Sequence, residues 1–143
     1  MYKINCPLWV QVSKNKRFML NLNQYRNAHH FTLNNAKREF ENDVMLQVLQ
    51  IKKQLSRFKL VYTLYKNDKR KCDTNNICTI VDKFFCDVLI KEGRIKDDNY
   101  NYLTETTFKW GGIDPENPRV EVQIIPIDED KEQRMKLVKE AGF

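Results

Sequence analysis

Apolar residues recur every three or four positions along two long segments, a spacing that predicts two amphipathic helices. We expect the first helix to begin at Asn34 or Asn35 and to end near Ser56. Its apolar stripe comprises Ala36, Phe40, Val44, Val48, Ile51 and Leu55. The second helix follows Asp73 and ends before a turn that contains Gly93. Its apolar positions are Ile77, Ile80, Val81, Phe84, Phe85, Val88 and Leu89.

Shorter segments rich in β-branched and aromatic residues predict four strands, over residues 4–12, 58–66, 102–110 and 119–127. Pro7 lies near the start of the first, which favours an edge strand or a bulge there. Residues 13–32 are polar and irregular and predict a long loop, and a short helix over residues 129–141 closes the chain. We therefore expect one α/β domain over residues 1–143, a small mixed β-sheet packed with two main helices.

Length and composition narrow the class of protein. A chain of 143 residues can bury one core without disulfides or structural metals. No run approaches 18 apolar residues and the N-terminus lacks a signal-peptide pattern, so we expect a cytoplasmic protein that does not enter a membrane. The cysteines lack C-x-x-C spacing, which disfavours zinc and disulfides and favours a reducing compartment. They are Cys6, Cys72, Cys78 and Cys86.

Charge is divided unevenly along the chain. Residues 1–71 carry 15 Lys and Arg against 4 Asp and Glu, whereas residues 72–143 carry 10 against 15. A basic half beside an acidic half suits a protein that neutralises a phosphate backbone with one part and holds cations with the other, although a generic basic surface gives the same count. The predicted backbone contacts lie in the long loop and in the turn before the second helix. They are Lys14, Lys16, Arg17, Arg26, Lys69, Arg70 and Lys71.

The loop has alternative interpretations. Its cations alternate with Phe18 and Tyr25, as in segments that contact nucleic acid, but a solvated loop has the same composition. His29 and His30 have no evident ligand partners, so we interpret them as loop residues with DNA contact as the lesser option.

Polar residues interrupt the second helix in a regular way. Asn76, Lys83 and Asp87 are spaced at i, i+7 and i+11, which places them on one helical face. Buried charges are costly unless they are paired or bind something, so their alignment favours a site for a hard divalent cation and a phosphate. The flanking aspartates are Asp73, Asp97 and Asp98. Each residue also has a simpler interpretation, namely a helix cap, turn residues, or an exposed Lys83–Asp87 pair.

The order D-x-N-N, then a Lys and an Asp four residues apart, then G-x-x-x-D-D, resembles the RusA-like family of Holliday-junction resolvases. The resemblance covers chiefly residues 73–99. It implies a homodimer that binds four-way DNA junctions and cuts two opposing strands with magnesium. Asp73 matches the first aspartate of the motif, Asn76 its asparagine and Lys83 its helical lysine. Asp87 and the Asp97–Asp98 pair match the remaining carboxylates.

Two departures accompany the resemblance. Asn75 stands where the family usually has a second aspartate, which removes one charged metal ligand. The segment between Asn76 and Asp87 is one helical turn longer than in the shortest members, which preserves the face.

We therefore expect a magnesium-dependent, structure-selective endodeoxyribonuclease, with manganese as an alternative ion. The expected catalytic residues are Asp73, Lys83, Asp87 and Asp98. The expected metal ligands are Asp73, Asn75, Asp87, Asp97 and Asp98, and Asn76 joins the basic residues as a DNA contact. The alternatives are a non-catalytic DNA-binding protein that retains the fold, and an interaction protein that uses its basic half against an acidic partner.

Overall fold

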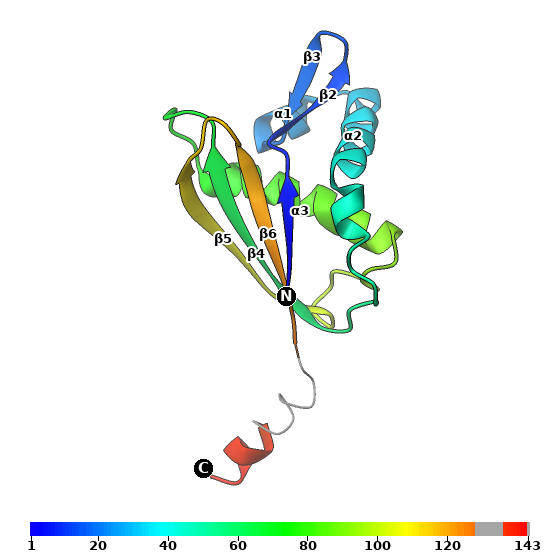
Figure 1. Cartoon of the computed structure of the whole chain (residues 1–143), viewed down its shortest axis with the longest axis vertical. Helices are drawn as coiled ribbons and strands as arrows, with labels where there is room; N and C mark the ends of the chain where they lie inside the picture. Colours follow the sequence, from blue (N-terminus) through cyan, green and yellow to red (C-terminus); the bar gives the residue numbers. More distant parts are fainter. Residues whose placement is uncertain (128–135, 143) are drawn as a thin grey trace.

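A mixed four-stranded sheet forms the centre of the computed structural model, which describes residues 1–127 and 136–142 (Figure 1). The strand order is β1-β6-β4-β5; β4 is antiparallel to β6 and parallel to β5. A second sheet is the hairpin of β2 and β3, which projects away from the first. The strands are β1 (Tyr2–Cys6), β2 (Trp9–Ser13), β3 (Lys16–Met19), β4 (Phe58–Lys66), β5 (Leu103–Ile113) and β6 (Arg119–Pro126). The predicted α/β fold with a small mixed sheet is confirmed.

Two long helices pack on the sheet. Helix α3 (Thr74–Lys91) connects the parallel strands β4 and β5 and contacts both. Helix α2 (His30–Val48) packs against β1, β2 and α3, and the short helix α1 (Leu22–Asn27) packs against α3. Within the described residues, no helix has both the length and the apolar character needed to cross a membrane.

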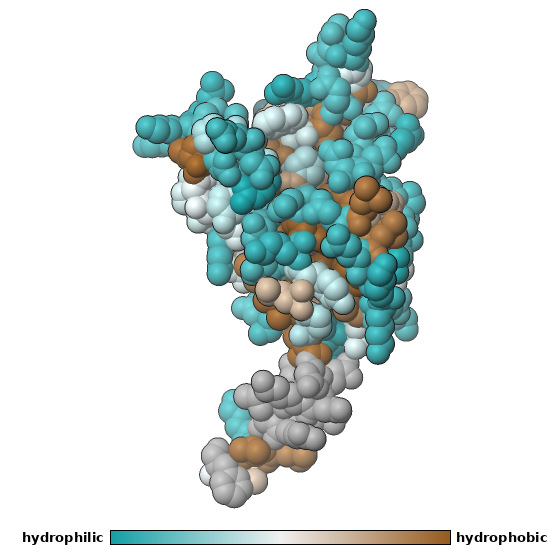
Figure 2. All heavy atoms as spheres, viewed as in Figure 1, coloured by the Kyte–Doolittle hydropathy of each residue, from teal (hydrophilic) through white to brown (hydrophobic). Residues whose placement is uncertain are grey.

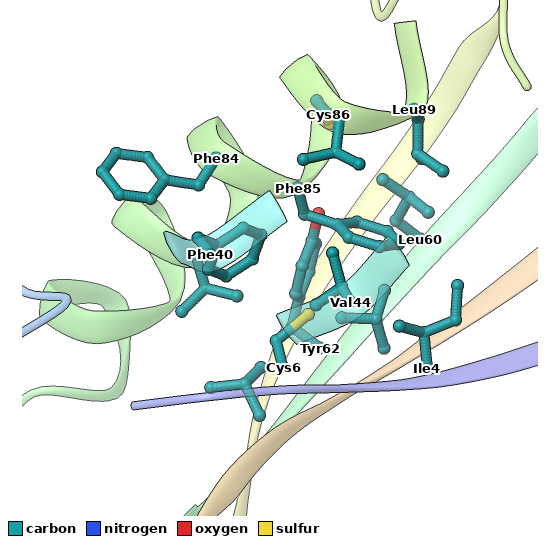
Figure 3. Close-up of a cluster of buried hydrophobic side chains, with 14 of the residues drawn as sticks. Ile4, Cys6, Phe40, Val44, Leu60, Tyr62, Phe84, Phe85, Cys86 and Leu89 are labelled. Atoms are coloured by element: carbon teal, nitrogen blue, oxygen red, sulfur yellow. The ribbon is translucent and has the colours of Figure 1, made fainter. Parts of the chain in front are cut away.

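The core lies between the sheet and the two long helices (Figure 3). Alternate residues of β4 are fully buried, as expected for a strand with one covered face, and Tyr62 is the largest of them. Its ring meets Phe85 of α3 edge-on at 6.4 Å between centroids. Phe84, one position earlier on α3, stacks on Phe18 at 6.3 Å and meets Phe40 edge-on at 5.6 Å. Phe84 therefore joins α3 to both α2 and the hairpin.

The first predicted strand, residues 4–12, is wrong in its extent, because β1 and β2 belong to different sheets and the break between them includes Pro7. A proline has no N–H for the ladder, which suits it to this change of sheet. The predicted edge position is confirmed for β1.

The long loop predicted over residues 13–32 is wrong. Lys14 and Asn15 form a two-residue turn into β3, and α1 follows with Asn21 as its cap, whose Oδ1 accepts a hydrogen bond from Gln24 N–H at 2.8 Å. The sequence pattern conceals the hairpin because Phe18 is the single buried residue of β3.

Helix α2 begins earlier and ends earlier than predicted. Its cap is His29 rather than Asn34 or Asn35, and its last residue is Val48. Ile51 and Leu55 are buried as predicted, but they lie beyond the helix, where Leu55 forms a bridge with Ile95. The other three strands lie within three residues of their predicted ends. The predicted last helix, residues 129–141, falls largely outside the described residues; residues 136–140 are helical.

Candidate functional site

Helix α3 turns its polar face toward α1. Oδ1 of Asn76 accepts a hydrogen bond from the backbone N–H of Leu22 at 3.0 Å. Two turns further on, the Lys83 ammonium lies 5.9 Å from the ring centroid of Tyr25. The predicted alignment of Asn76 and Lys83 is therefore real, and its Asn76 end serves to hold the start of α1.

Three of the predicted site residues share one small cavity. Lys83, Asp87 and Asp98 line a space of about 200 Å³ together with Tyr25 and Phe84. Lys37 of α2 lines the same space, although the sequence pattern did not single it out. We call this group the Asp98 cavity; it places two ammonium groups beside two carboxylates.

The two closing aspartates differ in their surroundings. Asp97 accepts hydrogen bonds from the Asp98 N–H at 2.8 Å and from Asn99 Nδ2 at 2.7 Å, and these donors lower the pKa of its carboxyl group. Partial removal from water raises the pKa of Asp98, and the neighbouring carboxyl groups of Asp97 and Asp82 raise it further. Asp97 thus orders the turn, while Asp98 is the carboxylate that a nearby positive charge would stabilise.

Asp82 is a half-buried carboxylate that was not predicted as a site residue. Its Oδ1 accepts hydrogen bonds from the hydroxyl of Tyr62 and from the thiol of Cys86, the latter at 3.3 Å. Burial and the Asp82 charge raise the pKa of Cys78 to about 12, so that thiol is inert at neutral pH. The signal in the sequence was the spacing of Asp82 at four residues from both Cys78 and Cys86, which places it on the buried side of α3.

Asp73 and Asn75 lie at the opposite end of α3 from the Asp98 cavity. Both are exposed, and Asp73 is the residue before the helix, although its side chain makes no capping hydrogen bond. Fourteen positions along α3 separate Asp73 from Asp87, which corresponds to about 21 Å at the rise of an α-helix. One ion cannot bind both carboxylates at that separation.

The predicted metal ligands consequently do not form one centre. In the described part of the chain, no three Asp, Glu, His or Cys side chains are arranged to hold a metal ion. Four carboxylates lie in or near the Asp98 cavity, namely Asp82, Asp87, Asp97 and Asp98. Asp73 and Asn75 lie at the other end of α3. The donor set therefore does not fit a preformed magnesium centre.

The predicted DNA contacts occupy one end of the molecule. Lys14, Lys16 and Arg17 are exposed on the hairpin, where the Arg17 guanidinium lies 5.0 Å from the ring centroid of Trp9. A cavity of about 380 Å³ separates the base of the hairpin, at Met19–Asn21, from the turn that contains Arg70 and Lys71. Figure 2 shows hydrophilic side chains over the hairpin and over the neighbouring turns. Two segments that are far apart in sequence thus form one basic end; Arg26, at the end of α1, is exposed nearby on the chain.

Several contacts between Lys66, Asp68 and Arg70 hold the turn before α3 together. Lys66 is nearly buried; its ammonium donates to Arg70 O at 3.1 Å and pairs with Asp68 at 3.5 Å. The Arg70 N–H also donates to Asp68 Oδ1, at 3.0 Å. These contacts leave Lys69, Arg70 and Lys71 exposed to solvent.

His29 and His30 lie at the start of α2 and not in a loop. Nδ1 of His29 accepts a hydrogen bond from the Phe31 N–H at 3.3 Å, and the two imidazole rings lie 4.3 Å apart. His29 thus has a structural role as a helix cap.

No protein-family model matches this sequence, and no curated protein matches it.

Proposed function

We propose that this protein is a structure-selective DNA endonuclease that acts on branched DNA such as four-way junctions. The proposal is supported by the resemblance of α3 and the turn after it to the motif order of the RusA-like resolvases, together with a basic end made of two segments. The resemblance also implies a homodimer, which would present two such sites to opposing strands.

The basic residues have the chemistry required for the DNA backbone. Lys14, Lys16 and Arg17 on the hairpin and Lys69–Lys71 on the turn can neutralise phosphates on either side of a shared cavity. Such contacts give affinity and position the duplex without reading its sequence.

The Asp98 cavity has the chemistry required near a reacting phosphate. Lys83 and Lys37 supply positive charge that can stabilise a phosphate as negative charge develops on it. Asp98 and Asp87 line the same cavity and are the carboxyl groups placed there to exchange a proton or to accept a cation. Magnesium belongs to the proposal through the resemblance alone, because the described ligands form no preformed centre.

A non-catalytic DNA-binding protein that retains the fold is the second candidate. It is favoured by Asn75, which replaces a carboxylate of the motif, and by the separation of Asp73 from the Asp98 cavity. Both candidates use the same basic end, so only an assay of strand cleavage separates them.

The test is cleavage of an end-labelled four-way junction in Mg²⁺, in Mn²⁺ and in EDTA. We expect cleavage with either metal ion and none in EDTA. Asp98→Asn should reduce the rate at least about a hundredfold with junction binding retained, and Lys83→Ala about 10²–10³-fold. Glu105→Gln, an exposed carboxylate change near the start of β5, should cut at the wild-type rate. Binding without cleavage under every condition would support the second candidate, and absence of binding would exclude both.

A further inference from the structure

A large cavity opens between the basic turn and the free edge of the sheet. Its volume is about 750 Å³. It is lined by the cations Lys69, Arg70 and Lys71, by the carboxylates Asp68 and Asp73, by the first residues of α3, and by Trp110 and Ile113 of β5. Strand β5 is an edge strand of the sheet. The cavity lies beside the DNA contacts of the proposed function, but its aromatic wall has no role in them.

Trp110 is exposed because of where α3 begins. It lies two residues after Phe108, on the same face of β5, and Phe108 packs edge-on against Tyr62 at 5.5 Å. Trp110 is opposite Leu64 near the end of β4, where the helix has only started, and its side chain remains 52% exposed. The start of α3 therefore leaves a large aromatic side chain half in solvent beside the cations of the basic turn.

The cavity combines two kinds of recognition. The ammonium and guanidinium groups of Lys69, Arg70 and Lys71 attract phosphates, and the turn that carries them is held in place by Lys66 and Asp68. An indole face stacks on a nucleobase whatever the base is. Inside a duplex each base is covered on both faces by its neighbours, so away from the duplex ends an indole can stack only on a base that has left the helix.

We propose that this cavity holds an unpaired nucleotide of branched DNA, whose base stacks on Trp110 while Lys69–Lys71 contact the flanking phosphates. The inference rests on the proposed function, because it assigns to this cavity the recognition of the branch point, where the continuous stack of base pairs is interrupted and a base pair can open. Trp110 is thus the residue that distinguishes branched from continuous DNA.

The test measures binding of fluorescein-labelled DNA to Trp110→Ala, Trp110→Phe and the wild type. The probes are a single-stranded thymidine oligonucleotide, a four-way junction and a blunt duplex of equal length. Trp110→Ala should weaken binding of the oligonucleotide by about tenfold to a hundredfold, weaken junction binding less, and leave duplex binding unchanged. Trp110→Phe should retain most of the affinity, because a phenyl ring also stacks. Leu46→Ala, at an exposed apolar position on α2, is the matched control and should bind as the wild type does.

A spectroscopic measurement reports stacking directly. The chain has two tryptophans, so Trp110 alone remains in the Trp9→Phe variant. Its emission should be quenched on addition of the thymidine oligonucleotide and unchanged on addition of the duplex. Emission that is blue-shifted before DNA is added, and that depends on protein concentration, would place a second copy of the chain on Trp110 and overturn the proposal.

The outcomes separate this inference from the proposed function. If Trp110→Ala bound each of the three probes as tightly as the wild type does and still cut the junction, the stacking site would be overturned. The proposed endonuclease function would be unaffected. Trp110-dependent binding of the oligonucleotide, without junction cleavage in Mg²⁺ or Mn²⁺, would support the stacking site and exclude the endonuclease.

Discussion

The hydroxyl of Tyr62, on the central strand β4, donates a hydrogen bond to Oδ1 of Asp82 on α3. Tyr62 is fully buried, and burial together with the neighbouring Asp82 carboxylate raises its pKa well above the ordinary value. The hydroxyl therefore remains protonated and always serves as the donor. This bond links the sheet to α3 one position away from Lys83, and so supports the helix that carries the candidate site.

Removal of this donor should destabilise the fold. Tyr62→Phe leaves the half-buried Asp82 carboxylate with the weaker Cys86 thiol as a donor, so we expect a decrease of about 1–3 kcal/mol in the free energy of unfolding. Urea unfolding followed by circular dichroism measures the decrease. Tyr2→Phe, on the edge strand β1, is the control and should change stability by less than about 0.5 kcal/mol. An unchanged midpoint for Tyr62→Phe would mean that the bond contributes nothing net.

Asp97 and Asp98 should respond to pH in opposite directions. The pKa of Asp98 is raised above its ordinary value of 3.8, so the native state takes up its proton more readily than the unfolded state does. Its ionised form therefore costs stability at neutral pH, and that cost disappears as pH falls through the raised pKa to below 3.8. Asp98→Asn should stabilise the protein at neutral pH, with no difference from the wild type in acid.

The pKa of Asp97 is lowered from the same ordinary value of 3.8, so its ionised form stabilises the native state at neutral pH. That contribution is full above 3.8 and disappears as pH falls through the lowered pKa. Asp97→Asn should therefore destabilise the protein at neutral pH and match the wild type only in strong acid. Urea midpoints of both variants across the acidic range check the pair; shifts of the same sign would contradict the different surroundings of the two carboxylates.

Alanine variants of Asn75 and Asn76 should differ in their effect on the stability of the fold. Asn76→Ala leaves the Leu22 N–H without its acceptor, and we expect the free energy of unfolding to fall by about 0.5–2 kcal/mol, as for other helix caps. Asn75→Ala removes an exposed side chain and should change stability by less than about 0.5 kcal/mol. Thermal unfolding measures both. If Asn76→Ala were as stable as the wild type and bound junction DNA more weakly, the predicted DNA contact would be its main role.

Much of the fold follows from local patterns in the sequence. Strand β4 and the buried stripe of α2 have strong periodicities of apolar residues. Gly93 follows the end of α3 at φ +69°, a left-handed conformation that glycine adopts more readily than other residues. The Gly93 N–H donates to Ile90 O and the Arg94 N–H to Leu89 O, which satisfies the last carbonyls of the helix. These signals depend only on residues that are close together in the chain, so these elements can be predicted from the sequence alone.

The wrong predictions fall where distant contacts decide the structure. The hairpin is anchored by Phe18 against Phe84, two residues far apart in the chain, and this packing leaves no periodicity within residues 13–32. The candidate site shows the same limit. The spacing of Asn76 and Lys83 correctly placed them on one face of α3. It did not reveal that the length of α3 separates Asp73 from Asp98. Asp82 was missed because its neighbours in the sequence are mostly apolar.

The basic hairpin should contribute to DNA binding through phosphates alone. Replacing Lys14, Lys16 and Arg17 with glutamine should weaken binding to every junction, whatever its sequence, because exposed cations release counterions from the backbone. The slope of log affinity against log salt should fall in magnitude by about 0.9 for each phosphate that the variant no longer neutralises. Glutamine is chosen because it keeps much of the Arg17 stem over Trp9, so that the hairpin retains its packing.

The matched control replaces Lys52 and Lys53 with glutamine, two exposed cations in the segment after α2, at the opposite end of the domain from the hairpin (Figure 1). This change should leave the salt slope unaltered, although it removes two positive charges against three in the hairpin variant. Equal slopes for the hairpin variant and the wild type would remove the hairpin from the interface. Equal weakening by both variants would show that DNA responds to the total charge of the protein, because a defined basic end predicts weaker binding for the hairpin variant alone.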